Sequence, residues 1–179
     1  MIFVTVGTQL PFDRLVRTVD DWAGATPGIR GVAQTGPSAY APANLETFAF
    51  LAPQKFDLYF QQADLIVAHA GMGTILTALQ LKKRLIVMPR SAALQEHRSD
   101  HQFDTVRHLP HRLGIQVAEN EHELLHLLEM PSTATPAVPD PLPEASPDLL
   151  NTIRHFIDGR KPVPRFTVER PELPLTVSS

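Results

Sequence analysis

The chain has 179 residues, of which 43% are hydrophobic and 20% charged, with a formal net charge of −3 and no cysteine. This length is enough for one domain with a full hydrophobic core. The lack of cysteine excludes disulfides, thiolate metal ligands and cysteine nucleophiles, and the slightly acidic balance gives none of the basic surface that nucleic-acid binding needs.

The sequence carries no recognisable membrane or export signal. Its apolar runs are all shorter than the roughly 18 residues that span a bilayer. Its first residues, MIFVTVGTQ, lack the basic region and the small-residue cleavage site of a signal peptide. We therefore expect a cytoplasmic protein whose association with a membrane would come through a partner or a surface patch.

Proline divides the chain into two parts, because ten of its 17 prolines lie after residue 130. We predict a folded body over residues 1–130 and a Pro-rich tail over residues 131–179. Within the tail, 131–147 has the composition of an extended linker. Residues 147–158 carry one helical pattern, made by Leu149, Leu150, Ile153, Phe156 and Ile157. This helix could dock on a partner or fold back on the sheet of the body.

The first half of the body alternates between strands and helices. Residues 2–6 form a β-branched apolar run that is typical of a buried strand. An amphipathic helix is predicted next, from the helical spacing of Phe12, Leu15, Val16, Val19 and Trp22. Two short strands at 31–34 and 47–51 and a short helix at 54–62 complete this half.

The second half continues the alternation. A buried strand at 64–68 leads through a glycine turn into a helix whose inward side is predicted to carry Ile75, Leu76 and Leu79. A strand at 85–88, a helix at 100–109 and a strand at 114–117 follow.

A capping box of Asn120 and Glu123 predicts the start of the last helix of the body. This helix bears Leu124, Leu125, Leu127 and Leu128. Strands that alternate with helices are typical of a parallel sheet covered on both faces. The predicted fold of the body is therefore α/β, with a Rossmann-like parallel sheet and helices on both faces.

Two glycine turns each follow a predicted strand and precede a helix. They are Gly7-Thr8-Gln9 and Gly71-Met72-Gly73-Thr74. Glycine lets backbone N–H groups approach an anion, and the N-terminus of the next helix favours negative charge, so both turns are candidates for binding phosphate. The alternative is that they only allow tight packing. Neither matches a Walker A loop or the dinucleotide pattern Gly-x-Gly-x-x-Gly, which disfavours phosphoryl transfer from ATP and NAD-dependent chemistry.

A third candidate segment, residues 90–102, follows the strand at 85–88 and is expected at the same edge of the sheet. It is dense in groups that bind hydroxyls, phosphates or a carboxylate: Arg90, Glu96, His97, Arg98, His101 and Gln102. The alternative is a solvated loop and helix start. His97 and His101 have the i, i+4 spacing of metal ligands, but their surroundings do not match the His-Glu-x-x-His of zinc proteases. We predict no metal and no cofactor.

Three stretches in this order resemble one known family: residues 3–9 with 11–16, then 63–74, then 96–102. They are similar to the donor-binding subunits of split GT-B glycosyltransferases. These subunits resemble the family 28 C-terminal domain and act in the dolichol pathway or in bacterial exopolysaccharide assembly. The resemblance implies one half of a GT-B fold and a UDP-sugar donor.

The resemblance also implies where the donor binds. By position, Gly7, Thr8 and Gln9 would face the diphosphate. His69 and the turn Gly71-Met72-Gly73-Thr74 would contact phosphate and sugar, and His101 and Gln102 would approach the sugar hydroxyls. Arg90, Glu96 and His97 complete the predicted donor-binding set. Dolichol-pathway relatives have a Glu that reaches the ribose where this chain has Thr77, so no residue is assigned to the ribose.

The implied activity is an inverting, metal-independent transfer of a sugar from a UDP-sugar to a polyprenyl-diphosphate-linked saccharide in exopolysaccharide assembly. A membrane-associated, acceptor-binding glycosyltransferase subunit would supply the general base and hold this chain at the inner membrane face, so no catalytic residue is assigned here. One alternative is a nucleotide-sugar-binding regulatory subunit without turnover. Another is an epimerase-like hydrolase, which the length disfavours because such enzymes carry both domains in one chain.

The donor sugar stays open between several candidates. Arg90, His97 and Arg98 would suit a carboxylate, since Arg binds carboxylates bidentately. UDP-glucuronate therefore stands beside UDP-glucose, UDP-galactose and UDP-N-acetylglucosamine.

Overall fold

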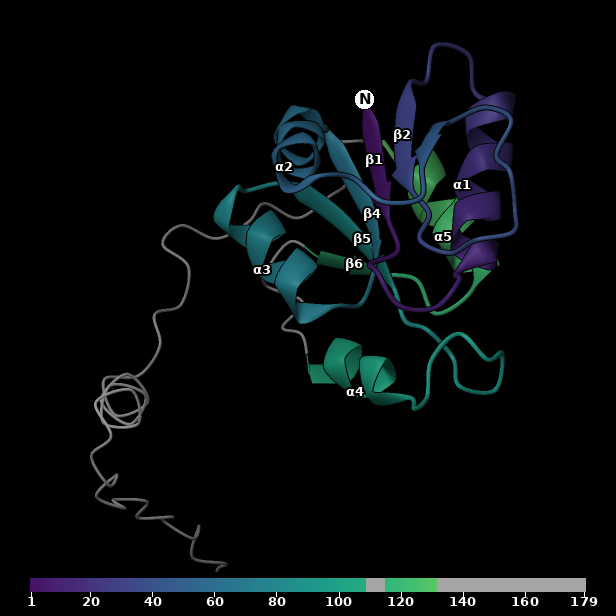
Figure 1. Ribbon diagram of the computed structural model, residues 1–179, viewed down its shortest axis with the longest axis vertical. Helices are drawn as coiled ribbons and strands as arrows, with labels where there is room; N and C mark the ends of the chain where they lie inside the picture. The colour runs from purple at the N-terminus through teal and green to yellow at the C-terminus, as the bar shows by residue number, and fades with distance from the viewer. Residues whose placement is uncertain (109–114, 132–179) are drawn as a thin grey trace, which may run out of the picture. The chain divides into compact units, whose positions relative to one another are not determined.

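A parallel sheet with the strand order β3-β2-β1-β4-β5-β6 forms the centre of the fold (Figure 1). The computed structural model describes residues 1–108 and 115–131. Every neighbouring pair of strands is parallel, which requires crossover connections rather than tight hairpins. The strands are β1 (Ile2–Thr5), β2 (Gly31–Gln34), β3 (Glu46–Phe48), β4 (Leu65–His69), β5 (Arg84–Met88) and β6 (Ile115–Val117).

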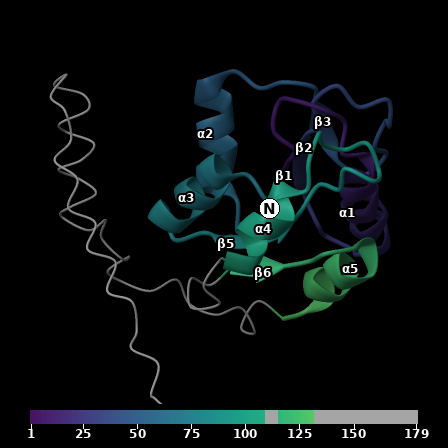
Figure 2. The same cartoon turned by 90° about the horizontal axis from the view of Figure 1, so that it is seen from below.

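Helices cover both faces of this sheet, which confirms the predicted Rossmann-like α/β fold. One face packs against α1 (Asp13–Ala25) and α5 (Glu121–Glu129). The other packs against α2 (Pro53–Gln62) and α3 (Met72–Gln80), as Figure 2 shows from below. The short helix α4 (His101–His108) lies beyond the carboxyl ends of the strands (Figure 1).

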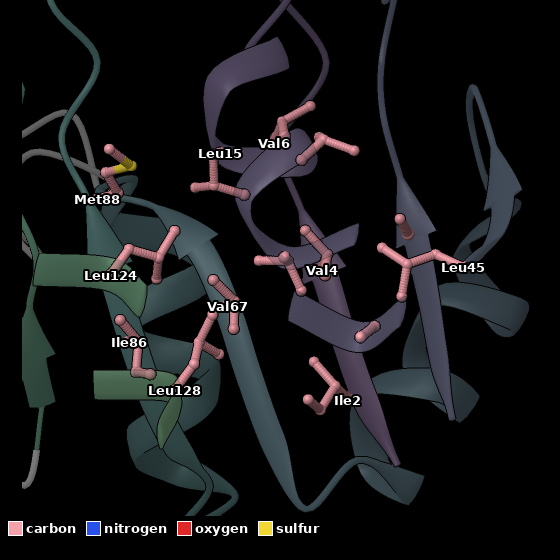
Figure 3. Packing of buried hydrophobic residues seen from close by; sticks show 14 of the residues in the cluster. Ile2, Val4, Val6, Leu15, Leu45, Val67, Ile86, Met88, Leu124 and Leu128 are labelled. Carbon is pink, nitrogen blue, oxygen red and sulfur yellow. The ribbon is translucent and has the colours of Figure 1, made fainter. Parts of the chain in front are cut away.

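Alternate strand residues point into two separate hydrophobic cores. Val4 and Val67 pack with Leu15 of α1 in one core (Figure 3). Phe3 and Ile66 lie in the other core, with α2 and α3. All five side chains are fully buried. The central strands are thus apolar on both faces, which explains why they are continuous apolar runs in the sequence.

The capping box at the start of α5 is confirmed. The Asn120 side chain accepts a hydrogen bond of 2.9 Å from the backbone N–H of Glu123. The Glu123 carboxylate in turn accepts one of 2.9 Å from the N–H of Glu119. The first bond satisfies an N–H of the first helical turn that has no partner within the helix, so the sequence signal marks the helix start correctly.

One predicted inward residue is wrong, and one strand is shorter than expected. Leu76 is 51% exposed, because α3 buries the side that carries Ile75, Ala78 and Leu79. β3 ends at Phe48 rather than at residue 51.

Some predictions fall on residues that the structure does not describe. Residues 109 and 114, predicted to end a helix and begin a strand, lie outside the described residues, as does the tail from residue 132. In the described ranges, 1–108 and 115–131, there is no helix long and apolar enough to cross a membrane.

Candidate functional site

The strand order places a switch point between β1 and β4. From these neighbours the chain continues to β2 on one side and to β5 on the other. In parallel α/β sheets, ligands bind at the carboxyl ends of the strands beside such a point. A cavity of about 290 Å³ lies there. It is lined by residues from all three predicted segments: Val6, Gly7, Thr8, Gln9, His69, Gly71, Arg90, His97, His101 and Gln102.

The loop after β1 forms one wall of this cavity. Gly7 has φ +77°, a left-handed conformation that other L-residues adopt only with strain. Its N–H donates to Thr5 Oγ1 at 3.4 Å. Thr8 and Gln9 are exposed at the cavity, so their polar side chains are free to meet a ligand.

The His69 imidazole at the end of β4 fills the space beside both glycine turns. A Cβ on Gly7 would lie 2.9 Å from His69 Cε1, and a Cβ on Gly71 would lie 2.3 Å from His69 Nε2. Both distances are shorter than carbon and nitrogen atoms tolerate. The two glycines are therefore required by the ring that lies beside them, and the ring joins the two turns into one site.

The second turn leads directly into α3. Gly71 is the N-cap residue, and no side chain caps the helix there. The first N–H groups of a helix lack partners within it and carry its positive dipole end. Met72 and Gly73 are exposed, Thr74 is partly buried, and none of these three lines the cavity as Gly71 does. A Cβ on Gly73 would meet nothing within 4 Å.

His69 is held in its neutral form. Burial lowers its pKa to about 4, and the positive charge of Arg90 adds to the shift. Among the described residues, its Nδ1 is the buried side-chain atom without a hydrogen-bond partner. Neutral imidazole offers one donor and one acceptor, so His69 can bond a ligand without contributing charge.

Arg90, which the sequence suggested as a ligand for the donor, forms its hydrogen bonds within the protein. Its side chain is 2% exposed. Its terminal nitrogens donate to the backbone carbonyls of Val6, Leu10, Pro11 and Glu96, at 2.6 to 2.9 Å. These bonds occupy both guanidinium ends, so a carboxylate grip by Arg90 is not supported.

Glu96 is likewise engaged with the protein. Its carboxylate receives two bonds from Arg14, of 2.6 Å and 3.0 Å, and one of 2.9 Å from the N–H of Ser91. Glu96 is buried and does not line the cavity. Arg14 and Glu96 are 82 residues apart, so no local pattern in the sequence could have revealed this pair.

Two histidines and a glutamine also line the cavity. The rings of His97 and His101 meet edge to face with centroids 4.5 Å apart. Ser99 lies between them, with its Oγ 3.0 Å from His101 Nδ1. Gln102 is buried and accepts a bond of 3.0 Å from the Arg90 N–H. Residues 1–108 and 115–131 contain no group of three possible metal ligands, whereas these side chains suit hydroxyl and phosphate groups.

Comparison with known proteins decides the family. Residues 1–133 match the glycosyltransferase family 28 C-terminal domain. The chain belongs to this family. The family resemblance predicted from the sequence is thus confirmed.

Individual relatives agree with this family 28 assignment. The chain is 32% identical over 62 residues to the UDP-N-acetylglucosamine transferase subunit ALG13 of Candida albicans, a match that spans 35% of this chain and 21% of that protein. The solution structure of an ALG13 protein has a TM-score of 0.54 at 20% identity, covering 85% of this chain and 93% of that one.

The fold is also similar to one part of a larger protein. MurG of Acinetobacter baumannii has a TM-score of 0.51 at 19% identity, and the match covers 70% of this chain and 39% of MurG. These structural matches confirm that the chain has the fold of one half of a GT-B enzyme.

The contact between His69 and Gly71 predicts opposite effects of alanine at the two glycines of the second turn. Gly71→Ala forces a methyl group against the imidazole and should lower the free energy of unfolding by about 1–3 kcal/mol. Gly73→Ala meets open space in a helix and should be neutral or stabilising by up to about 1 kcal/mol. Urea denaturation of both variants checks this, and equal losses would contradict the packing described.

The lowered pKa of His69 predicts a dependence of stability on pH. Its folded pKa of about 4 lies below the unfolded value of about 6.5. The unfolded chain therefore binds the proton first as pH falls. The free energy of unfolding should therefore keep the full contribution of neutral His69 above about pH 6.5. It should decline as the pH falls from there to about 4. This decline should be smaller in His69→Gln, and an imidazole NMR titration midpoint near 6.5 would refute the assignment.

Proposed function

We propose that this chain is the donor-binding subunit of a two-chain, inverting glycosyltransferase that uses a UDP-sugar. The observation that carries the proposal is the junction of the two glycine turns around neutral His69, at the switch point of the sheet. In this junction the turn after β1 lies beside the residues that lead into the N-terminus of α3. Such an arrangement suits a diphosphate, and the family assignment supports its being that of a UDP-sugar.

The chemistry follows from charge development on the diphosphate. The acceptor hydroxyl attacks the anomeric carbon of the sugar, and the bond from that carbon to the diphosphate oxygen breaks. The bonding electrons leave with UDP, whose negative charge increases. Donors at the helix terminus, Thr8 and His69 would stabilise that charge, and preorganised donors of this kind lower the barrier. His97, His101 and Gln102 would orient the sugar.

The acceptor side belongs to the same proposal. The described residues form one Rossmann-like domain, whereas a GT-B site lies in the cleft between two. We propose that a membrane-associated glycosyltransferase subunit supplies the second domain, the general base and a polyprenyl-diphosphate-linked saccharide in exopolysaccharide assembly. The chain would then be cytoplasmic and peripheral at the inner membrane. The partnership is supported by the similarity to ALG13, which is named as a transferase subunit.

Binding of UDP is the direct test of the donor site. The full-length chain, with and without its partner, should bind UDP in isothermal titration. Thr8→Val should weaken binding about tenfold, the effect of one lost hydrogen bond to a charged group. Thr18→Val is the matched control, because the Thr18 hydroxyl bonds only its own helix, at Arg14 O. No binding of UDP or UDP-sugars at millimolar concentration would overturn the proposal.

A second test concerns residues 131–179, which we propose dock on the partner. A chain ending at Met130 should keep its UDP affinity but lose co-purification with the partner and sugar transfer. A truncated chain that still transfers sugar at the full rate would show that the tail has no such role. If the complete pair binds UDP but transfers no sugar to any lipid-linked acceptor, the chain is a regulatory subunit instead.

A further inference from the structure

We propose that Arg90 is a positioning residue of the donor site. Its buried guanidinium fixes the two loops that flank the cavity in one arrangement, and it places a permanent positive charge behind the expected diphosphate. This inference rests on the proposed function. In this role Arg90 does not bind the donor through its own side chain. It acts on the donor through the backbone groups of the residues that it holds in place.

The first loop is held at both of its ends. One terminal nitrogen of Arg90 donates to Val6 O at 2.6 Å and to Leu10 O at 2.7 Å. The other donates to Pro11 O at 2.8 Å. Residues 7–9 lie between these hydrogen-bonded carbonyls, so the guanidinium holds the two ends of the loop together. The conformation that brings Gly7, Thr8 and Gln9 to the cavity is therefore fixed before any ligand binds.

The second loop is held by the same residue. The guanidinium donates to Glu96 O at 2.9 Å, and the backbone N–H of Arg90 donates to Gln102 Oε1 at 3.0 Å. Arg14 of α1 also holds this loop in place. It donates two hydrogen bonds to the Glu96 carboxylate and one of 2.9 Å to Pro89 O. One side chain thus links the walls that carry Thr8 and His101.

The charge of Arg90 is not neutralised by a hydrogen-bonded carboxylate in this cluster. The acceptors of its guanidinium are all carbonyl oxygens, and the nearest carboxylate, Glu96, is bonded to Arg14. Burial lowers the pKa of Arg90 to about 10, which still leaves it protonated at neutral pH. Glu96 stabilises the charge of Arg90 through space, and Arg14 forms a second ion pair, of 3.5 Å, with Glu121. The two arginines and two glutamates of this cluster therefore balance in net charge, but the hydrogen bonds of the Arg90 guanidinium go to carbonyl oxygens alone.

This charge is felt inside the cavity. It is one of the causes that lower the pKa of His69, a side chain on the cavity wall. The Arg90 guanidinium is buried with carbonyl oxygens as its hydrogen-bond acceptors, so a diphosphate in the cavity would interact favourably with its charge. The site therefore has an electrostatic reason to favour an anionic ligand.

The experiment compares stability with affinity in the full-length chain. Arg90→Met removes the charge and the hydrogen bonds, and Arg90→Lys keeps the charge with fewer donors in a different geometry. Arg17→Met is the matched control, since Arg17 is exposed on α1 and stacks on Tyr40. For each folded variant we measure the Kd of UDP, the thermal midpoint, and the hydrogen exchange of the amides of residues 7–10.

Arg90→Met should weaken UDP binding about tenfold to a hundredfold and speed exchange of these amides. Arg90→Lys should recover part of the affinity, and Arg17→Met should change neither quantity. If Arg90→Met does not fold, Arg90→Lys carries the test, with intermediate losses expected in both measurements. A role in stability alone would lower the thermal midpoint and leave the Kd of the folded protein unchanged, and that result would overturn the inference.

The inference and the proposed function can fail separately. If wild-type protein does not bind UDP, the donor proposal is wrong, and the exchange of residues 7–10 alone decides whether Arg90 fixes the loop. If wild type binds UDP and both Arg90 variants bind it within twofold of wild type, the donor proposal stands and the role of Arg90 is wrong.

Discussion

The packing of one imidazole against two glycines is the contact on which the site depends. It requires β1 and β4 to be neighbours, in a register that pairs Thr5 with Ala68. Only then does the turn after β1 lie beside the ring at the end of β4. Because β1 and β4 are adjacent, the His69 ring brings the two glycine turns together at the cavity. Because the ring is neutral, it achieves this without adding a second buried charge.

Around this contact, buried polar side chains form hydrogen bonds with the loops rather than pointing free groups at a ligand. Arg90 and Glu96 are buried, and their hydrogen bonds go to backbone groups and to Arg14. Loops at the end of a sheet have few regular backbone bonds, so buried side chains must satisfy their carbonyl and N–H groups. Preorganised loops are what a charged ligand needs, since their donors do not have to be rearranged on binding.

The sequence predicted the alternation of elements well, because buried parallel strands and capped helices leave strong local patterns. The Asn120 cap and the apolar run of β4 are examples. It failed where a residue's neighbours are distant in the chain. Leu76 lies next to the buried Ile75, and only packing decides which side of α3 faces the sheet. The bonding of Arg90 to two loops depends on the folded arrangement, so the sequence could identify its chemical type but not its task.

The two glycines at the start of α3, Gly71 at its N-cap and Gly73 in its first turn, have different surroundings. At Gly71 the interior leaves no room for a side chain, whereas beside Gly73 there is open space. Across homologous proteins, replacement of the first glycine should therefore coincide with a smaller residue in place of His69. The second glycine has no neighbouring atom that excludes a side chain. Whether homologous proteins keep it should therefore depend on the ligand that occupies the space beside it.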